Sequence, residues 1–231
     1  MLIFLPGLIC NAQIFAPQLA AFPGARVAPS YGVLNRLDAM ARLVLDNAPE
    51  RFDLFGHSMG GRIALEVVRQ APERVRRLAL VSTGVHGVGE GEAQKRHALQ
   101  AIGYEQGFEA LVDHWLPPML APDHRDDKAI IDPLRAMCIS MGQEVFDAQI
   151  AALLARNEAK SLLPSMTCPT LVMTGTLDSW SPPDQHAAMA ETLPDARLEI
   201  IEGSGHMITC EASKEVNDAI TRWLDMPVLR P

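Results

Sequence analysis

FDLFGHSMGGRIALEVVRQ, residues 52–70, is the most informative stretch of the sequence. Apolar residues alternate through Phe52–Phe55 and run into Gly56, a pattern typical of a strand that ends in a turn. Met59–Gln70 then repeats apolar residues at the spacing of one helix face. The stretch therefore predicts a strand, a tight turn centred on Ser58 and a helix.

A serine on such a turn is well placed to act as a nucleophile. The strained dihedrals of the turn push the hydroxyl clear of the backbone, and Gly56 and Gly60 leave room for strand and helix to pack closely. The positive end of the helix favours negative charge that develops at the serine. The five-residue pattern G-x-S-x-G alone is weak. Its position between a predicted strand and a predicted helix makes Ser58 the candidate nucleophile.

The same alternation of strand and helix extends on both sides of this stretch. The predicted strands are Leu2–Leu5, Ala25–Pro29, Phe52–Phe55, Val75–Ser82, Pro169–Thr174 and Arg197–Ile201, and the predicted helices are Val33–Asn47, Met59–Gln70, one that begins at Ser181 as its N-cap, and Ser213–Leu224. This order predicts an α/β fold, with a mostly parallel sheet and helices on both faces.

The alternation stops between residues 84 and 163, where only helical patterns occur. We expect residues 1–83 and 164–231 to form the α/β core and residues 84–163 to form a helical cap or lid inserted into it. The predicted cap helices are Glu92–Ile102, Phe108–Trp115, Lys128–Met141 and Glu144–Arg156.

Asp178 and His206 are the candidates for the acid and the base that activate Ser58. In chains with this order of elements, the nucleophile, acid and base follow one another, each at the end of a strand. Asp178 follows the strand at Pro169–Thr174, and His206 follows the strand at Arg197–Ile201. The remaining histidines and two further aspartates are weaker alternatives: His57 should point away from Ser58, His86 could line the pocket, His97, His114 and His124 lie in the insertion, His186 should be exposed on its helix, and Asp184 and Asp195 suit a helix start and a turn.

Acyl transfer also needs backbone N–H groups that bind a developing oxyanion. The residue after the nucleophile, Met59, should supply one, and Leu8, in the loop after the first strand, should supply the other. Cys10, Trp115 and Trp180 are candidates for the substrate pocket. Most apolar residues of the insertion are expected to pack its helices against the sheet.

The composition excludes several classes of function. The chain has 231 residues and a formal net charge of -8, which disfavours binding to nucleic acid. Its four cysteines are not spaced as metal ligands, and their low density indicates reduced thiols in a cytoplasmic protein. Residues 1–10 are better explained as a buried strand than as a signal peptide, and no apolar run reaches transmembrane length. We expect no metal, cofactor or membrane partner, and the oligomeric state stays open.

With these residues in place, the chain resembles the α/β-hydrolase superfamily along essentially its whole length. The motifs that carry the resemblance are LPGL at Leu5–Leu8, GHSMGG at Gly56–Gly61, PTLVMTGTLD at Pro169–Asp178 and GSGH at Gly203–His206. The nearest likeness is to small bacterial esterases, including pimeloyl-carrier-protein methyl ester esterases and 3-oxoadipate enol-lactonases. The chain departs from the family pattern at Pro6-Gly7, where most members have His-Gly.

The residues and the resemblance together predict a serine hydrolase that cleaves a small-molecule carboxylic ester of small or medium acyl chain through an acyl-enzyme. The same three residues could instead open a lactone, hydrolyse a thioester or a carbon–carbon bond, or transfer an acyl group. A non-catalytic ligand-binding protein on the same scaffold is a further alternative. The presence of Ser58, Asp178 and His206 together argues against it.

Overall fold

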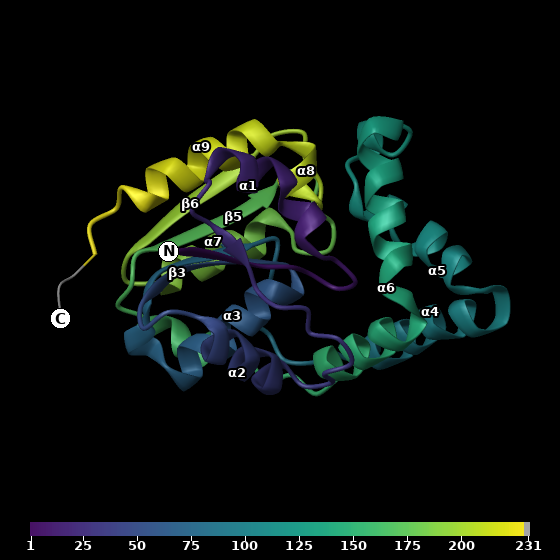
Figure 1. Cartoon of the computed structure of the whole chain (residues 1–231), viewed down its shortest axis with the longest axis horizontal. Helices are drawn as coiled ribbons and strands as arrows, with labels where there is room; N and C mark the ends of the chain where they lie inside the picture. The colour runs from purple at the N-terminus through teal and green to yellow at the C-terminus, as the bar shows by residue number, and fades with distance from the viewer. Residues whose placement is uncertain (229–231) are drawn as a thin grey trace.

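One sheet of six parallel strands organises the computed structural model, which describes residues 1–228 (Figure 1). The strand order is β2-β1-β3-β4-β5-β6. The strands are β1 Leu2–Leu5, β2 Arg26–Val27, β3 Phe52–His57, β4 Val75–Val81, β5 Thr170–Gly175 and β6 Ala196–Ile201. The predicted α/β class with a parallel sheet is confirmed.

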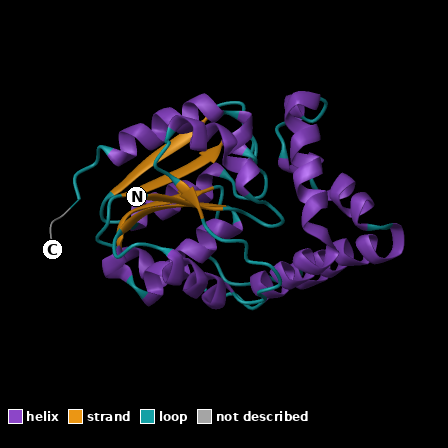
Figure 2. Cartoon of the chain, in the orientation of Figure 1, coloured by secondary structure: helices purple, strands orange, loops and turns teal. Residues whose placement is uncertain are grey.

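Helices cover both faces of this sheet (Figure 2). In Figure 1, α1 and α9 lie on one side of the strands and α2 and α3 on the other, while α7 packs against β5 and β6. Their bounds are α1 Ala16–Ala21, α2 Leu37–Asn47, α3 Met59–Gln70, α7 Pro183–Thr192, α8 Ile208–Glu211 and α9 Ser213–Leu224. No helix within residues 1–228 is long and apolar enough to span a membrane.

Two helices begin later than predicted. The first, α2, begins at Leu37 rather than Val33, because Arg36 still has extended dihedrals (φ -143°, ψ 134°). The second, α7, begins at Pro183, and Ser181 is not its N-cap. The backbone N–H of Ser181 instead donates to the carboxylate of Asp178, so this residue belongs to the loop after β5.

Strands β1, β3 and β5 are buried along their whole length, as expected of parallel strands covered on both faces. A cluster of aromatic rings packs β1 and β3 against the turn before α1. The ring of Phe4 lies 4.8 Å from that of Phe15 and 5.2 Å from that of Phe55. This packing fixes the position of the loop that follows β1, which is part of the site described below.

A group of three helices separates β4 from β5 and stands beside one end of the sheet (Figures 1 and 2). These are α4 Glu92–Gln106, α5 Phe108–Trp115 and α6 Lys128–Leu154. Within α6, Gly142 has non-helical dihedrals (φ 81°, ψ 163°) and bends the chain. The predicted break between two helices at this point is confirmed. Glycine suits this position because it adopts a left-handed φ at little cost.

Candidate active site

Ser58 occupies a strained turn between β3 and α3. Its φ of 55° and ψ of -118° are unusual for a residue with a side chain, and its N–H donates to the carbonyl of Val81 at 2.9 Å. Gly60 cannot be replaced without movement, because a Cβ there would collide with the backbone carbonyl of Leu5. The close approach of β1, β3 and α3 therefore holds the serine hydroxyl at the carboxyl end of the sheet.

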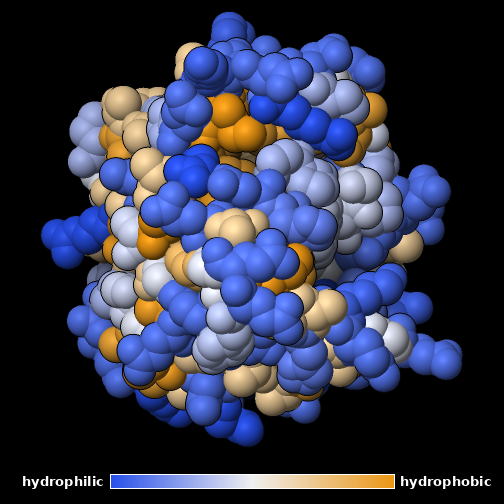
Figure 3. Space-filling model, turned by 90° about the vertical axis from the view of Figure 1, so that its right-hand side faces the viewer, coloured by the Kyte–Doolittle hydropathy of each residue, from blue (hydrophilic) through white to orange (hydrophobic). Residues whose placement is uncertain are grey.

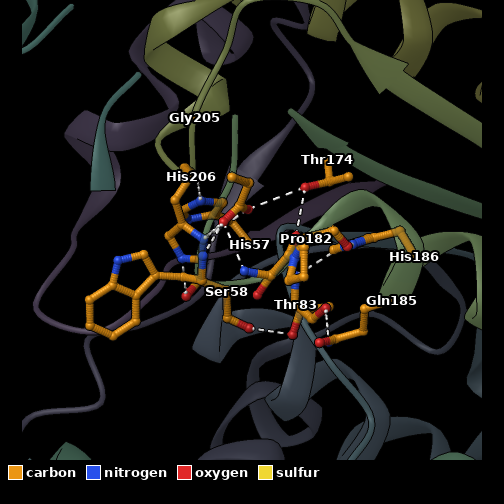
Figure 4. A network of polar contacts seen from close by, with 12 residues as sticks. His57, Ser58, Thr83, Thr174, Pro182, Gln185, His186, Gly205 and His206 are labelled. Atoms are coloured by element: carbon orange, nitrogen blue, oxygen red, sulfur yellow. Dashed lines mark hydrogen bonds and ion pairs between the residues drawn. The ribbon is translucent and has the colours of Figure 1, made fainter. Parts of the chain in front are cut away.

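The structure brings Ser58, His206 and Asp178 together in a hydrogen-bonded chain. Figure 4 shows Ser58 and His206 of this chain. His206 Nε2 lies 2.8 Å from Ser58 Oγ, and His206 Nδ1 lies 3.0 Å from each carboxylate oxygen of Asp178. The three residues come from three different strand ends. The geometry allows His206 to take a proton from Ser58 while Asp178 holds the ring in one tautomer.

Asp178 is buried but kept ionised by its neighbours. Its carboxylate accepts hydrogen bonds from the N–H groups of Trp180 and Ser181 and from the hydroxyl of Thr174. Burial alone raises the pKa of Asp178, but the charge and hydrogen bond of His206 and the Ser181 N–H outweigh burial and lower this pKa to about 2. A charged carboxylate is therefore present to stabilise a protonated His206.

The backbone of His206 is fixed on both sides. Its N–H donates to the carbonyl of Met119 at 2.8 Å, and its carbonyl lies 2.8 Å from Nε2 of His57. Burial, followed by the nearby His206, lowers the pKa of His57 to about 4, so the ring is neutral and donates from Nε2. His57 thus contacts the backbone of His206 instead of the hydroxyl of Ser58, which agrees with its expected structural position.

Glu211 ties the same loop to the segment before α6. One oxygen of its buried carboxylate accepts hydrogen bonds from the N–H of Gly205 at 3.1 Å, the N–H of Ala121 at 2.7 Å and Nδ1 of His124 at 2.9 Å. Gly205 also faces this segment directly, since a Cβ at that position would lie 2.5 Å from the backbone nitrogen of Ala121. Residues 119–121 and the loop that carries His206 therefore form one closely packed unit.

The two predicted oxyanion donors lie beside Ser58. Leu8 and Met59 both line the cavity that contains the serine. Met59 is the first residue of α3, so its N–H has no partner within the helix, and the N–H of Leu8 donates to no other group within residues 1–228. The next residue, Ile9, has a left-handed φ of 46°, and its N–H donates to Oε1 of Gln149 at 2.7 Å. Gln149, on α6, was not predicted as part of the site.

A cavity of about 270 Å³ opens over Ser58 and His206. Trp115 and Trp180, both predicted, line it, as do Met119 and Leu99. Cys10 does not line it: its buried thiol donates to the carbonyl of Leu8, and the residue faces a separate cavity with Asn11. The side of the molecule that carries α4–α6 is largely hydrophilic, with apolar residues recessed between polar ones (Figure 3).

Three charged residues of the cavity wall were not predicted, whereas His86 was named as a possible lining residue. Arg62, Glu92 and Arg96 line the same cavity as the apolar residues. The available signal was the position of Arg62, four residues and about one helical turn after Ser58.

The prediction that His186 is exposed is wrong. Its ring is fully buried, and Nε2 accepts a hydrogen bond from the N–H of Thr83 (Figure 4). Within residues 1–228, no group of three or more histidine, cysteine, aspartate or glutamate residues is arranged to hold a metal ion.

Comparison with known proteins agrees with this architecture. A family model described as the alpha/beta hydrolase family matches residues 2–219. The chain belongs to the alpha/beta hydrolase family. A pimeloyl-acyl-carrier-protein methyl ester esterase of Chromobacterium violaceum is 28% identical to this hydrolase over 202 residues, 84% of this chain and 78% of the relative.

Solved structures of the family share the fold of this hydrolase. A thermophilic esterase from Thermogutta terrifontis has a TM-score of 0.87 at 24% identity and covers 96% of this chain and 88% of its own. The enol-lactonase from Burkholderia xenovorans LB400 has a TM-score of 0.81 at 22% identity, and the match covers 96% of this chain and 90% of the enol-lactonase chain. The resemblance to small bacterial esterases and enol-lactonases that the motifs indicated is confirmed.

Proposed function

We propose that this alpha/beta hydrolase cleaves carboxylic esters of small or medium acyl chain by a serine mechanism. The observation that carries the proposal is the hydrogen-bonded chain from Ser58 through His206 to Asp178, with the N–H groups of Leu8 and Met59 in the same cavity. The name of the methyl ester esterase relative agrees with an ester substrate.

In the proposed reaction, His206 Nε2 takes the proton of Ser58 as Oγ attacks the ester carbonyl. The carbonyl oxygen becomes an oxyanion bound by the N–H groups of Leu8 and Met59. The carbon–oxygen bond to the alcohol then breaks, and the leaving alkoxide receives the proton from His206. Asp178 stabilises the imidazolium throughout and stays ionised.

The acyl group is released by the reverse sequence with water. His206 takes a proton from a water molecule, which attacks the acyl carbonyl and forms a second oxyanion in the same hole. Collapse of this intermediate breaks the bond to Ser58 Oγ, which recovers its proton from His206. The products are a free acid and the original enzyme.

The proposed limit on acyl length follows from the cavity. About 270 Å³ accommodates a small ligand, and Trp115, Leu99 and Met119 are part of the wall of the cavity that contains Ser58. We assign residues 84–163 the role of a cap, because α4, α5 and the segment before α6 supply these walls. Opening of a lactone ring would use the same residues, with the leaving oxygen retained in the product.

The test is hydrolysis of p-nitrophenyl acetate, butyrate and octanoate by the wild type, Ser58→Ala and Ser165→Ala. Ser165 is exposed and lies outside the cavity. Ser165→Ala therefore removes one hydroxyl, as Ser58→Ala does, but leaves the cavity unchanged. We expect Ser58→Ala alone to lose at least ~10³-fold in kcat/KM, and octanoate to be the poorest substrate. A fluorophosphonate probe should label the wild type and not Ser58→Ala. Equal turnover and equal labelling of these two proteins would refute the serine mechanism.

A further inference from the structure

Glu92 is shared by two arginines at the edge of the cavity. Its carboxylate forms a bidentate pair with Arg156 at 2.6 Å and 2.7 Å, and it also accepts from Nε of Arg96 at 2.8 Å. The side chain of Arg156 is almost completely buried, so Glu92 is required to compensate its charge. One carboxylate therefore already accepts hydrogen bonds from two guanidinium groups.

Arg62 is a third guanidinium group in the same place, and it has no acidic partner within residues 1–228. Its hydrogen-bonding contacts are with His86, where Nη1 donates to the carbonyl at 2.8 Å and Nη2 lies 3.2 Å from the ring nitrogen Nε2. Burial lowers the pKa of His86, with Arg62 as the next cause, so this ring is neutral and brings no compensating charge.

The charge of Arg62 is costly in the free enzyme. Burial, followed by the repulsion of Arg156, lowers the pKa of Arg62 from 12.5 to about 9. Lys95, which is exposed at the rim of the cavity, adds a further cation without an ion-pair partner in the described part of the chain. The wall is thus strongly cationic in a protein whose net charge is -8.

This cationic wall faces the same cavity as the reactive groups. Arg62 lies about one helical turn beyond Ser58 on α3, and both residues line the cavity with His206. An anion bound by Arg62 would therefore belong to the molecule whose ester lies at Ser58.

We propose that Arg62, supported by Arg96 and Lys95, binds a free carboxylate carried by the ester substrate, so that the natural substrate is an acidic ester. The inference rests on the proposed function and specifies its substrate class. A guanidinium group binds a carboxylate through two parallel hydrogen bonds, and Arg62 has donors left after its contacts with His86. A bound carboxylate supplies a second negative charge to this wall, where Glu92 is already shared by Arg96 and Arg156.

The experiment compares two pairs of esters that differ by one charge. Monomethyl glutarate is compared with methyl pentanoate, and O-butyrylglycolate with the neutral O-butyrylglycolamide, by following acid release. The first pair carries the carboxylate on the acyl part, and the second carries it on the alcohol part. In at least one pair, we expect kcat/KM of the wild type to be at least ~10-fold higher for the acidic ester, which equals about 1.4 kcal/mol of transition-state binding.

The variants are Arg62→Gln and Arg135→Gln, which remove the same charge. Arg135 pairs with Asp113 and Glu109 and lies outside the cavity. Arg62→Gln should reduce the ratio of kcat/KM for the acidic ester to kcat/KM for the neutral ester to near one. Arg135→Gln should keep the wild-type ratio. Wild-type ratios near one in both pairs overturn the proposal, even where the neutral esters are hydrolysed and the proposed function stands.

Thermal unfolding gives a readout that does not depend on turnover. Glutarate should raise the Tm of the wild type and of Arg135→Gln more than that of Arg62→Gln. If no ester is hydrolysed, the proposed function fails. An increase in Tm that depends on Arg62 would still support the anion site. Equal effects of glutarate on the three proteins would then overturn the site as well.

Discussion

Oε1 of Gln149 accepts a 2.7 Å hydrogen bond from the backbone N–H of Ile9, across a separation of 140 residues. Gln149 is on α6, between β4 and β5 in the chain, whereas Ile9 follows the proposed oxyanion donor Leu8. Ile9 is β-branched and has a left-handed φ of 46°, a conformation that persists only when its surroundings impose it. Helix α6 therefore helps to hold the proposed oxyanion loop in shape.

Replacing Gln149 by Leu should impair catalysis more than substrate binding. The buried N–H of Ile9 would lose its acceptor at a cost of about 1–3 kcal/mol, and the N–H of Leu8 would lose its fixed direction. We expect kcat for p-nitrophenyl butyrate to fall about 10-fold or more with a small change in KM. Gln143→Leu, on the same helix but bonded to Asp147, is the control and should keep kcat. A fall in both variants alike would contradict the role of Gln149.

Gly205→Ala should disturb the position of His206, the proposed base. A Cβ at this position would lie 2.5–2.8 Å from backbone atoms of residues 119–121, which cannot move as a flexible side chain can. We expect a loss of about 1–3 kcal/mol in the free energy of unfolding, together with at least a ~10-fold fall in kcat. Gly24→Ala, where nothing lies within 4 Å of the added carbon, is the matched control. A fully active Gly205→Ala enzyme would show that residues 119–121 do not position His206.

The buried ring of His57 should make the fold sensitive to mild acid. Its pKa is about 4 in the folded protein and 6.5 without burial, so the unfolded chain binds this proton first as the pH falls. Its stabilising contribution is complete above about pH 6.5 and is lost as the pH falls towards 4, by about 2 kcal/mol between pH 7 and pH 5.

Urea unfolding of the wild type and His57→Gln at pH 7 and pH 5 measures this loss. Glutamine retains a donor for the carbonyl of His206 but has no group that titrates. The variant should therefore lose less stability than the wild type over this interval. His86 and His186, whose pKa values burial also lowers, affect both proteins equally and cancel in the comparison. The same pH dependence in both proteins would contradict the assignment of a neutral buried His57.

Glu92→Gln should be strongly destabilising. Arg156 would remain almost fully buried without its carboxylate, beside Arg62 and Arg96, and breaking a buried ion pair typically costs about 3–5 kcal/mol. The exposed pair of Lys214 and Asp218 is the comparison, because Asp218→Asn should change stability by less than ~1 kcal/mol. Chemical denaturation of the two variants gives both values. Equal losses would show that Glu92 does not compensate the arginine cluster.

Local patterns predicted the parts of the fold that local chemistry controls. The turn at Ser58 and the break at Gly142 were predictable, because glycine and apolar spacing determine backbone shape over a few residues. The arrangement of Asp178 and His206 followed from their positions at the ends of parallel strands. The burial of His186 was not predictable, because it depends on Thr83, more than one hundred residues earlier in the chain.

The site residues that were not predicted from the sequence were missed for the same reason. Gln149, Glu92 and Arg156 act through partners on other elements, so their neighbouring residues give no signal of their roles. Arg62 was closer to detection because of its spacing from Ser58, but its lack of an acidic partner is visible only in three dimensions.

Residues 119–121 pack closely against the loop of His206. This packing matters for protein engineering. Substitutions at Met119 alter the substrate space and the support of the base together, because its carbonyl holds the N–H of His206. Leu99 and Lys95, on α4, line the same cavity and, within residues 1–228, make no hydrogen bond to that loop. A library designed to change substrate preference should therefore vary Leu99 and Lys95 and leave residues 119–121 intact.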